Sequence, residues 1–212
     1  VAWMIGEFAK REVAEKYVPD MITGEKLGSY CLTEPNAGSD AASLKTKAVK
    51  NGDHYLLTGQ KMFISGAGAT DVLVVMARTS DNGAKGISAF IVDANAEGVS
   101  YGKNEHKMGW KNQPTAAVHF SNVKVPVENL LGEEGQGFTF AMKGLDGGRI
   151  NIGTCAVGTA QAALDRAVQY VGERSQFGKT LDQFQSVQFK LADMLTELVA
   201  ARQMVRLAAY HL

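Results

Sequence analysis

The hydrophobic periodicity of the chain limits the possible folds more than any other feature of the sequence. From Gly28 to about Pro126, short apolar runs alternate with Gly-rich turns, a pattern that is typical of strands. Strands are predicted at residues 30–32, 45–50, 54–60, 61–65, 71–78, 87–93 and 116–125. Asn51-Gly52 is the strongest hairpin signal among the turns. Roughly a hundred residues of this kind indicate a β-barrel or sandwich.

Beyond Pro126 the apolar residues recur at helical spacing. Residues 136–174 and 181–212 predict two long antiparallel helices joined by a short loop near Gly178. Two helices alone would expose their apolar stripes, so we expect half of a four-helix bundle, completed by further chain or by another subunit. Glycines weaken the first helix by up to about 1 kcal/mol each, which favours close approach of a helix or ligand there.

The N-terminal segment is also predicted to be helical. Residues 1–16 read as one helix that Val18-Pro19 breaks, followed by a short helical turn from Asp20 to Thr23. Because the chain begins without Met and ends within a helical pattern, we interpret it as an internal piece of a longer protein. The predicted fold class is α+β. The predicted domains are the end of an N-terminal helical domain (1–27), a β-barrel domain (28–130) and the first half of a helical bundle domain (131–212).

The charge balance excludes some classes of partner. The chain has 22 Lys and Arg residues against 22 Asp and Glu residues, so no net charge favours a nucleic acid or an anionic membrane. No apolar run approaches the length of a membrane span. Cys31 and Cys155 are too far apart in the sequence to indicate a disulfide framework, which favours a reducing compartment. The histidines show no metal-ligand spacing, and no metal site is predicted.

One loop has the composition of a ligand-binding segment. The strand Tyr30-Cys31-Leu32 runs into Thr33-Glu34-Pro35-Asn36-Ala37-Gly38-Ser39-Asp40, where proline, asparagine and glycine prevent regular structure. Such a loop leaves backbone N–H groups unpaired, and Thr33 and Ser39 add hydroxyl groups. It can therefore donate hydrogen bonds to the rim of a flat, acceptor-rich ring or to a phosphate. The alternative is an ordinary polar turn between strands.

Three further segments combine suitable residue types. Phe63 and Ser65 would share one face of a strand, where a ring and a hydroxyl can border a planar ligand; the alternative is an ordinary core Phe. Asp146 and Arg149 share a helix face across Gly147 and Gly148, either as a solvated ion pair or beside a ligand. Arg174, at a helix end, suits either a phosphate or the helix dipole.

Together these segments resemble the acyl-CoA dehydrogenase family over almost the whole chain. The similarity rests on residues 30–40, 61–67, 144–152 and 173–185, with Asn36 where the family often has Gly and Phe63 where Trp is more frequent. The resemblance implies FAD as cofactor and acyl-CoA as substrate. The residues implied to bind FAD are Tyr30, Cys31, Leu32, Thr33, Gly38, Ser39, Phe63, Ile64, Ser65, Arg174, Phe184 and Gln185, the last two across a dimer interface. Those implied to bind acyl-CoA are Ser39, Asp146, Gly147, Gly148 and Arg149.

The resemblance also implies a reaction, the α,β-dehydrogenation of an acyl-CoA thioester with transfer of electrons to an electron-transfer flavoprotein. Segments 109–115, 144–152 and 191–202 favour a subgroup acting on short branched-chain substrates, as in valine catabolism. Gly148 stands where one branch of the family carries its catalytic Glu, so the base is expected beyond Leu212 and no catalytic residue is assigned within this chain. The implied assembly is a homotetramer, a dimer of dimers, in bacterial cytoplasm or in the mitochondrial matrix of a eukaryote.

Three alternatives stay open from the sequence. The chain could belong to another short-chain or branched-chain acyl-CoA dehydrogenase. It could come from a flavin-binding homologue without dehydrogenase activity, or from an oxidase or monooxygenase in which the reduced flavin reacts with oxygen.

Overall fold

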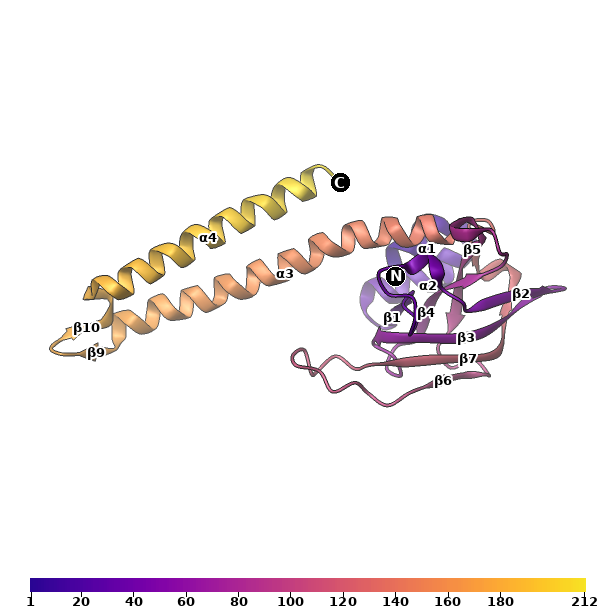
Figure 1. Cartoon of the computed structure of the whole chain (residues 1–212), viewed down its shortest axis with the longest axis horizontal. Coiled ribbons are helices and arrows are strands. Elements are labelled where there is room, and N and C mark those ends of the chain that lie inside the picture. Colours follow the sequence, from indigo (N-terminus) through magenta and orange to yellow (C-terminus); the bar gives the residue numbers. More distant parts are fainter. The chain divides into compact units, whose positions relative to one another are not determined.

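The computed structural model describes all 212 residues and forms two compact units, residues 1–142 and 143–212. The first unit contains the helices α1 (Ala2–Phe8) and α2 (Arg11–Thr23) and an eight-stranded sheet (Figure 1). Most of α3 (Gly137–Glu173) and all of α4 (Gln185–Tyr210) belong to the second unit. The predicted α+β class is confirmed, while the domain boundaries at residues 27 and 130 stay predictions about the complete protein.

The N-terminal segment forms two helices, so the prediction of one continuous helix over residues 1–16 was wrong. The backbone is extended at Ala9 and Lys10, with ψ of 159° and 150°, and this separates α1 from α2. Pro19 lies inside α2 and does not break it, contrary to expectation. Its ring fixes a φ that a helix accepts, and the proline removes a single N–H. The helix ends one turn later at Gly24, which adopts a left-handed φ of 79°.

The strands form one mixed sheet in the order β6-β7-β3-β2-β4-β5-β8, and β1 pairs in parallel with β4. Their bounds are β1 Gly28–Cys31, β2 Lys47–Asn51, β3 His54–Ser65, β4 Val72–Arg78, β5 Ile87–Asp93, β6 Val99–Tyr101, β7 Thr115–Pro126 and β8 Leu130–Leu131. The predicted runs 54–60 and 61–65 are one strand, β3, and the short β6 and β8 were not predicted. Asn51 pairs with His54 around a two-residue loop, which confirms the predicted hairpin.

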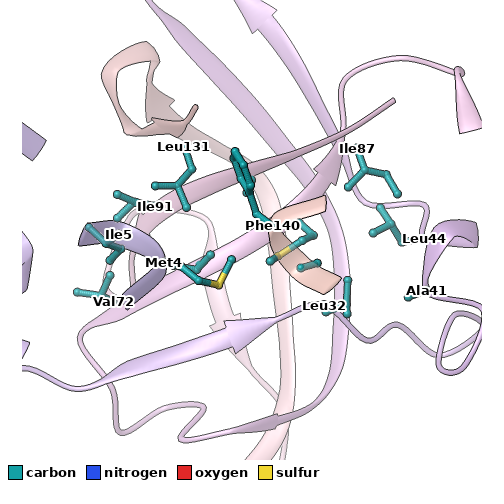
Figure 2. Close-up of a cluster of buried hydrophobic side chains, with 14 of the residues drawn as sticks. Met4, Ile5, Leu32, Ala41, Leu44, Val72, Ile87, Ile91, Leu131 and Phe140 are labelled. Atoms are coloured by element: carbon teal, nitrogen blue, oxygen red, sulfur yellow. The ribbon is translucent and has the colours of Figure 1, made fainter. Parts of the chain in front are cut away.

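The β4 and β5 strands are buried on both faces of the sheet. Alternate residues of β4 enter two separate apolar clusters, so this strand reads as a continuous apolar run. One cluster packs the sheet against the N-terminal helices and the start of α3, as Figure 2 shows for Met4, Ile5 and Phe140. The other cluster fills the space between β4–β5 and β3–β7, as a sandwich or barrel core does.

In the second unit, α3 and α4 pack against each other in opposite directions. Gly153 faces Val205, near one end of the pair, and residues 164–168 face residues 191–195 nearer the other end. The helices are joined by the hairpin β9 (Ser175–Gln176) and β10 (Lys179–Thr180), which turns at Phe177-Gly178, where both φ angles are positive. A 3₁₀ turn, Leu181–Gln183, leads into α4. The predicted long helical hairpin is confirmed, and α4 begins four residues later than predicted because that turn precedes it.

Many apolar side chains of these two helices stay exposed, among them Ile152, Val168, Leu195 and Met204. This is the pattern expected of two members of a larger bundle. No helix of the chain combines the length and apolar character that a membrane crossing requires.

Candidate functional site

The candidate site begins where β1 ends. Parallel pairing with β4 fixes the strand as far as Cys31, and the loop of residues 32–40 follows. Glu34 and Ala37 exchange two backbone hydrogen bonds of 3.1 Å, which close a tight turn with Pro35 and Asn36 exposed at its tip. The backbone N–H groups of Thr33, Gly38 and Ser39 donate no hydrogen bond within the chain. The predicted loop with unpaired donors is therefore present.

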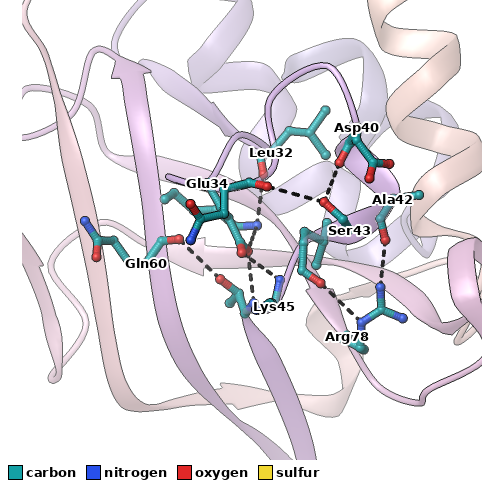
Figure 3. Close-up of polar contacts among 12 residues, drawn as sticks. Leu32, Glu34, Asp40, Ala42, Ser43, Lys45, Gln60 and Arg78 are labelled. Carbon is teal, nitrogen blue, oxygen red and sulfur yellow. Dashed lines mark hydrogen bonds and ion pairs between the residues drawn. The ribbon is translucent and has the colours of Figure 1, made fainter.

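A buried ion pair lies beneath this loop. Lys61 of β3 is fully buried, and its Nζ donates to Glu34 Oε1 at 2.8 Å and to the Leu32 carbonyl at 3.0 Å. The Glu34 carboxylate also accepts hydrogen bonds from the backbone N–H groups of Lys45 and Thr46, at 2.6 and 2.9 Å (Figure 3). The pair thus ties the loop to β3 and to the segment that enters β2.

The environment of the pair favours the ionised carboxylate. Burial opposes ionisation of Glu34, but the Lys61 ammonium and the hydrogen bonds from Lys61, Thr46 and Lys45 hold the pKa of Glu34 below its ordinary value. Burial lowers the pKa of the Lys61 ammonium, and the Glu34 carboxylate counteracts that effect.

The strand that carries Lys61 is irregular immediately afterwards. Lys61 pairs with Val118 and Ile64 with Ala116, so β3 contains one residue more than β7 in this interval. Phe63 adopts a left-handed φ of 57° in this bulge, and its side chain is 59% exposed. The prediction of a shared face assumed a regular strand, and the bulge interrupts the regular pairing at this point. Phe63 and Ser65 are nevertheless both exposed, with Ile64 buried between them.

Hydrogen bonds bring the loop and the bulge together. The Met62 N–H donates to the Thr33 carbonyl at 2.8 Å, which places Thr33 beside the residue that precedes Phe63. The Ser29 hydroxyl of β1 donates to the Ser65 carbonyl at 2.7 Å. The first unit therefore places Thr33, Phe63 and Ser65 along one junction between β1 and β3.

Several predicted site residues face the interior instead. Cys31, Leu32 and Ile64 are buried, so any contact from them to a ligand would come from the backbone. The Tyr30 hydroxyl donates to the Ala141 carbonyl at 3.1 Å, and burial raises its pKa. Burial also raises the pKa of the Cys31 thiol to about 12, against a smaller opposing effect of Lys61. Both the Tyr30 hydroxyl and the Cys31 thiol therefore stay protonated near neutral pH.

Arg78 of β4 fixes the segment that follows the loop. Its guanidinium donates to the carbonyls of Ala42 and Leu44, at 2.8 and 3.2 Å, and the Ser43 hydroxyl donates to the Asp40 carbonyl at 2.8 Å (Figure 3). Gly38 and Ser39 are exposed between the Glu34 turn and this clamp. Their open position is consistent with ligand contact, whereas the chain that follows is firmly fixed.

The second unit carries the remaining predicted residues. On α3, Arg149 Nη2 lies 3.7 Å from Asp146 Oδ1, with both side chains more than half exposed. Gly147 and Gly148 have nothing within 4 Å of the position a Cβ would occupy. The predicted pairing across an open, glycine-lined face is confirmed, whereas a role in binding stays a prediction.

Arg174 follows the last residue of α3, and its side chain is exposed. Its carbonyl accepts a hydrogen bond of 2.9 Å from the Leu181 N–H, which closes the β9–β10 hairpin. Phe184 immediately precedes α4, with Lys179 Nζ 4.2 Å from its ring centroid, and Gln185 is the first residue of the helix. Arg174, Phe184 and Gln185 therefore lie together at one end of the helical pair. Their contact with a cofactor stays a prediction.

Sequence reasoning assigned no role to Glu34 or Lys61, although both belong to the quoted segments. Lys61 is in phase with the buried Tyr55 and Leu57 on the same strand. A lysine at such a position requires a buried acidic partner, and this signal could have directed attention to Glu34. No group of three or more His, Cys, Asp or Glu side chains is arranged to hold a metal ion.

Comparisons with known proteins identify the family of this chain. Residues 29–123 match the family model described as acyl-CoA dehydrogenase, middle domain, and residues 135–212 match acyl-CoA dehydrogenase, C-terminal domain. Mitochondrial isobutyryl-CoA dehydrogenase of Dictyostelium discoideum is 52% identical, over 98% of this chain and 50% of the relative. The caffeyl-CoA reductase-Etf complex subunit CarC of Acetobacterium woodii is 51% identical, over 93% of this chain and 52% of the relative.

Among solved structures, butyryl-CoA dehydrogenase of Megasphaera elsdenii superposes with a TM-score of 0.93 and 48% identity, covering 97% of this chain and 54% of that one. The chain spans about half the length of the curated relatives that it matches. Both family models, the high identity over nearly every residue and the shared fold lead to one conclusion: this chain belongs to the acyl-CoA dehydrogenase family.

Proposed function

We propose that this chain forms the flavin-binding wall of an FAD-dependent dehydrogenase that oxidises a short branched-chain acyl-CoA, such as isobutyryl-CoA, at its α,β carbons. One observation supports this proposal most strongly. The loop of residues 32–40 offers unpaired N–H donors directly beside a β3 bulge that exposes an aromatic ring and a hydroxyl. That combination suits a flat, acceptor-rich ring.

The residues present fit FAD. Thr33, Gly38 and Ser39 would donate hydrogen bonds, Phe63 would lie against the ring system, and Ser65 would contact its edge. Arg174 would pair with the pyrophosphate, because a guanidinium can bind two phosphate oxygens at once. Phe184 and Gln185 would contact the cofactor from a second subunit. Homologues in this family are FAD-dependent, and bound FAD supplies hydride acceptance from the substrate's β-carbon.

The acyl-CoA would contact Ser39 of the loop and residues 146–149 of α3. The missing Cβ atoms of Gly147 and Gly148 leave room for a ligand along that helix face. The carboxylate that removes the α-proton is proposed to lie beyond Leu212. Gly148 occupies the position at which one branch of the family carries its base, so this chain contributes binding and orientation.

We also propose that electrons pass to an electron-transfer flavoprotein and that the protein is a homotetramer. The first proposal is supported by the Acetobacterium relative, whose name places it in a complex with such a protein. The Dictyostelium relative is mitochondrial by name, so a eukaryotic protein of this kind would lie in the matrix and a bacterial one in the cytoplasm.

A second candidate is an acyl-CoA dehydrogenase or enoyl-CoA reductase with a different acyl chain. This candidate is supported by the nearly equal sequence identity of the chain to isobutyryl-CoA dehydrogenase and to a caffeyl-CoA reductase subunit. A flavin-binding homologue without activity is the third. Steady-state assays of the full-length protein with three saturated substrates, isobutyryl-CoA, butyryl-CoA and a phenylpropanoyl-CoA, using an artificial electron acceptor, separate these candidates.

The proposal predicts the highest kcat/KM with isobutyryl-CoA and slow consumption of oxygen. Preference for a straight or aryl acyl chain would support the second candidate. No turnover with any acyl-CoA would support the third, and rapid oxygen consumption would indicate an oxidase.

A further inference from the structure

We propose that Lys61 is a positioning residue for the flavin, acting through the Leu32–Thr33 peptide. This inference rests on the proposed function, and it assigns a task to the buried Lys61–Glu34 pair that the binding residues themselves do not explain. Lys61 Nζ holds the Leu32 carbonyl at 3.0 Å while it is paired with Glu34.

The planar trans peptide between Leu32 and Thr33 determines the direction of the Thr33 N–H. In a trans peptide the carbonyl and the following N–H point in opposite directions. The chain has no cis peptide bonds, so drawing the Leu32 carbonyl inward towards buried Lys61 turns the Thr33 N–H away from the ammonium. That N–H donates to no group in the chain. The Thr33 carbonyl is also fixed, because it accepts the Met62 N–H at 2.8 Å. The Thr33 N–H is therefore an unpaired donor whose direction is fixed by the carbonyl groups on either side of it.

Glu34 makes this arrangement rigid. A lysine with no partner would be costly at 0% exposure, and its side chain could turn. Glu34 is itself fixed at four points: two backbone hydrogen bonds to Ala37 and two accepted from Lys45 and Thr46. The ion pair is neutral as a whole, so its predicted effect on a bound flavin comes from orienting the Thr33 donor and not from a net charge.

The consequence concerns the redox balance of the flavin. Reduced flavin carries more electron density than oxidised flavin, so a fixed N–H donor stabilises the reduced form more. Losing the anchor should weaken FAD binding and make reduction less favourable. Loss of one charge-assisted hydrogen bond corresponds to about a tenfold change in an equilibrium constant. For a two-electron couple, a tenfold change is about 30 mV.

The test uses the full-length protein with Lys61→Met, and with Lys61→Met combined with Glu34→Gln. The double variant leaves no unpaired buried charge and provides the test if the single variant fails to fold. Asn129→Ala is the matched control. Asn129 also donates one buried hydrogen bond to a backbone carbonyl, that of Ile91 at 3.0 Å, and its removal should lower the melting temperature alone.

The measurements are the dissociation constant of FAD, the midpoint potential and visible absorption spectrum of the bound flavin, and the melting temperature. The proposal predicts FAD binding about tenfold weaker, a lower midpoint potential and a changed spectrum in both Lys61 variants, with none of these changes in the control. If both variants lose stability and keep the wild-type flavin affinity and potential, Lys61 is purely structural and the inference fails. If the wild-type protein binds no FAD, the proposed function fails, and the inference with it.

Discussion

Burial of the Lys61–Glu34 pair removes two charged side chains from water, which has a cost in free energy. Removing two charges from water often costs as much as their attraction returns, and apolar replacements of such pairs are frequently neutral or stabilising. Lys61 is fully buried and Glu34 nearly so. The pair is therefore poorly explained as a source of stability. Its side chains form hydrogen bonds with the backbone at Leu32, Lys45 and Thr46, so the pair connects the loop to β3 and to the segment that enters β2.

Acid should destabilise the protein partly through Glu34. Its folded-state pKa lies below the ordinary pKa of a glutamate, despite burial, so its contribution is fully present above the ordinary pKa and is lost as the pH falls through the folded-state pKa. Urea unfolding at a series of pH values between 7 and 3 should show a smaller loss of unfolding free energy in Glu34→Gln than in the wild type. Equal losses in the two proteins would contradict the assignment.

Replacing Phe63 should affect FAD binding much more than it affects the stability of the fold. A left-handed conformation costs a non-glycine residue about 1 kcal/mol or more, and most of this ring is exposed. Phe63→Gly relieves that strain but adds flexibility to the unfolded chain, so the unfolding free energy should change by less than about 1 kcal/mol. FAD retention should fall. A variant that is strongly destabilised, or that binds FAD normally, would argue against a ring presented for stacking.

At the scale of elements, strands and helices with long periodic signals were predictable, and short ones were not. The apolar run of β4 and the stripes of α3 and α4 gave correct elements because each repeats its apolar pattern over a long segment. The two-residue strand β8 is too short to show a period, and it exists through its pairing with Ala89 and Phe90 of β5. Pro19 misled the prediction because one missing N–H does not outweigh the packing of α2 on the sheet.

The candidate site was also predictable only where the signal lies in the local sequence. Proline, asparagine and glycine mark an irregular loop wherever they gather, so the donors at Thr33, Gly38 and Ser39 could be inferred. The β3 bulge depends on β7, a partner more than fifty residues away in the chain, and no local sequence pattern indicates it. The burial of Lys61 likewise follows from tertiary packing.

Helix α3 offers a test of the glycine-lined face. A Cβ at Gly148 would meet nothing within 4 Å, so Gly148→Ala should stabilise the helix by about 1 kcal/mol. If the face borders the acyl-CoA, the same methyl group should raise the KM for substrate in the full-length protein. A thermal melt and steady-state kinetics measure both effects. Improved stability with an unchanged KM would remove residues 146–149 from the substrate site.

At the scale of the whole molecule, the chain is about half of its relatives, and much of its helical surface is apolar. The predicted contribution of Arg174 to a cofactor held between subunits belongs to this scale. Arg174→Ala should reduce the flavin content that survives gel filtration. Stability should change little, because the side chain is exposed and forms no ion pair. Unchanged flavin content would contradict a role at the pyrophosphate.

Anaerobic titration of the purified full-length protein with isobutyryl-CoA observes the flavin and the substrate in one experiment. If residues 32–40 and the β3 bulge form the wall of a flavin site in an acyl-CoA dehydrogenase, the protein should carry FAD, and each addition of substrate should bleach the visible flavin absorbance. A protein that carries no flavin, or whose flavin absorbance is unaffected by every acyl-CoA tested, would show that these residues do not form such a site.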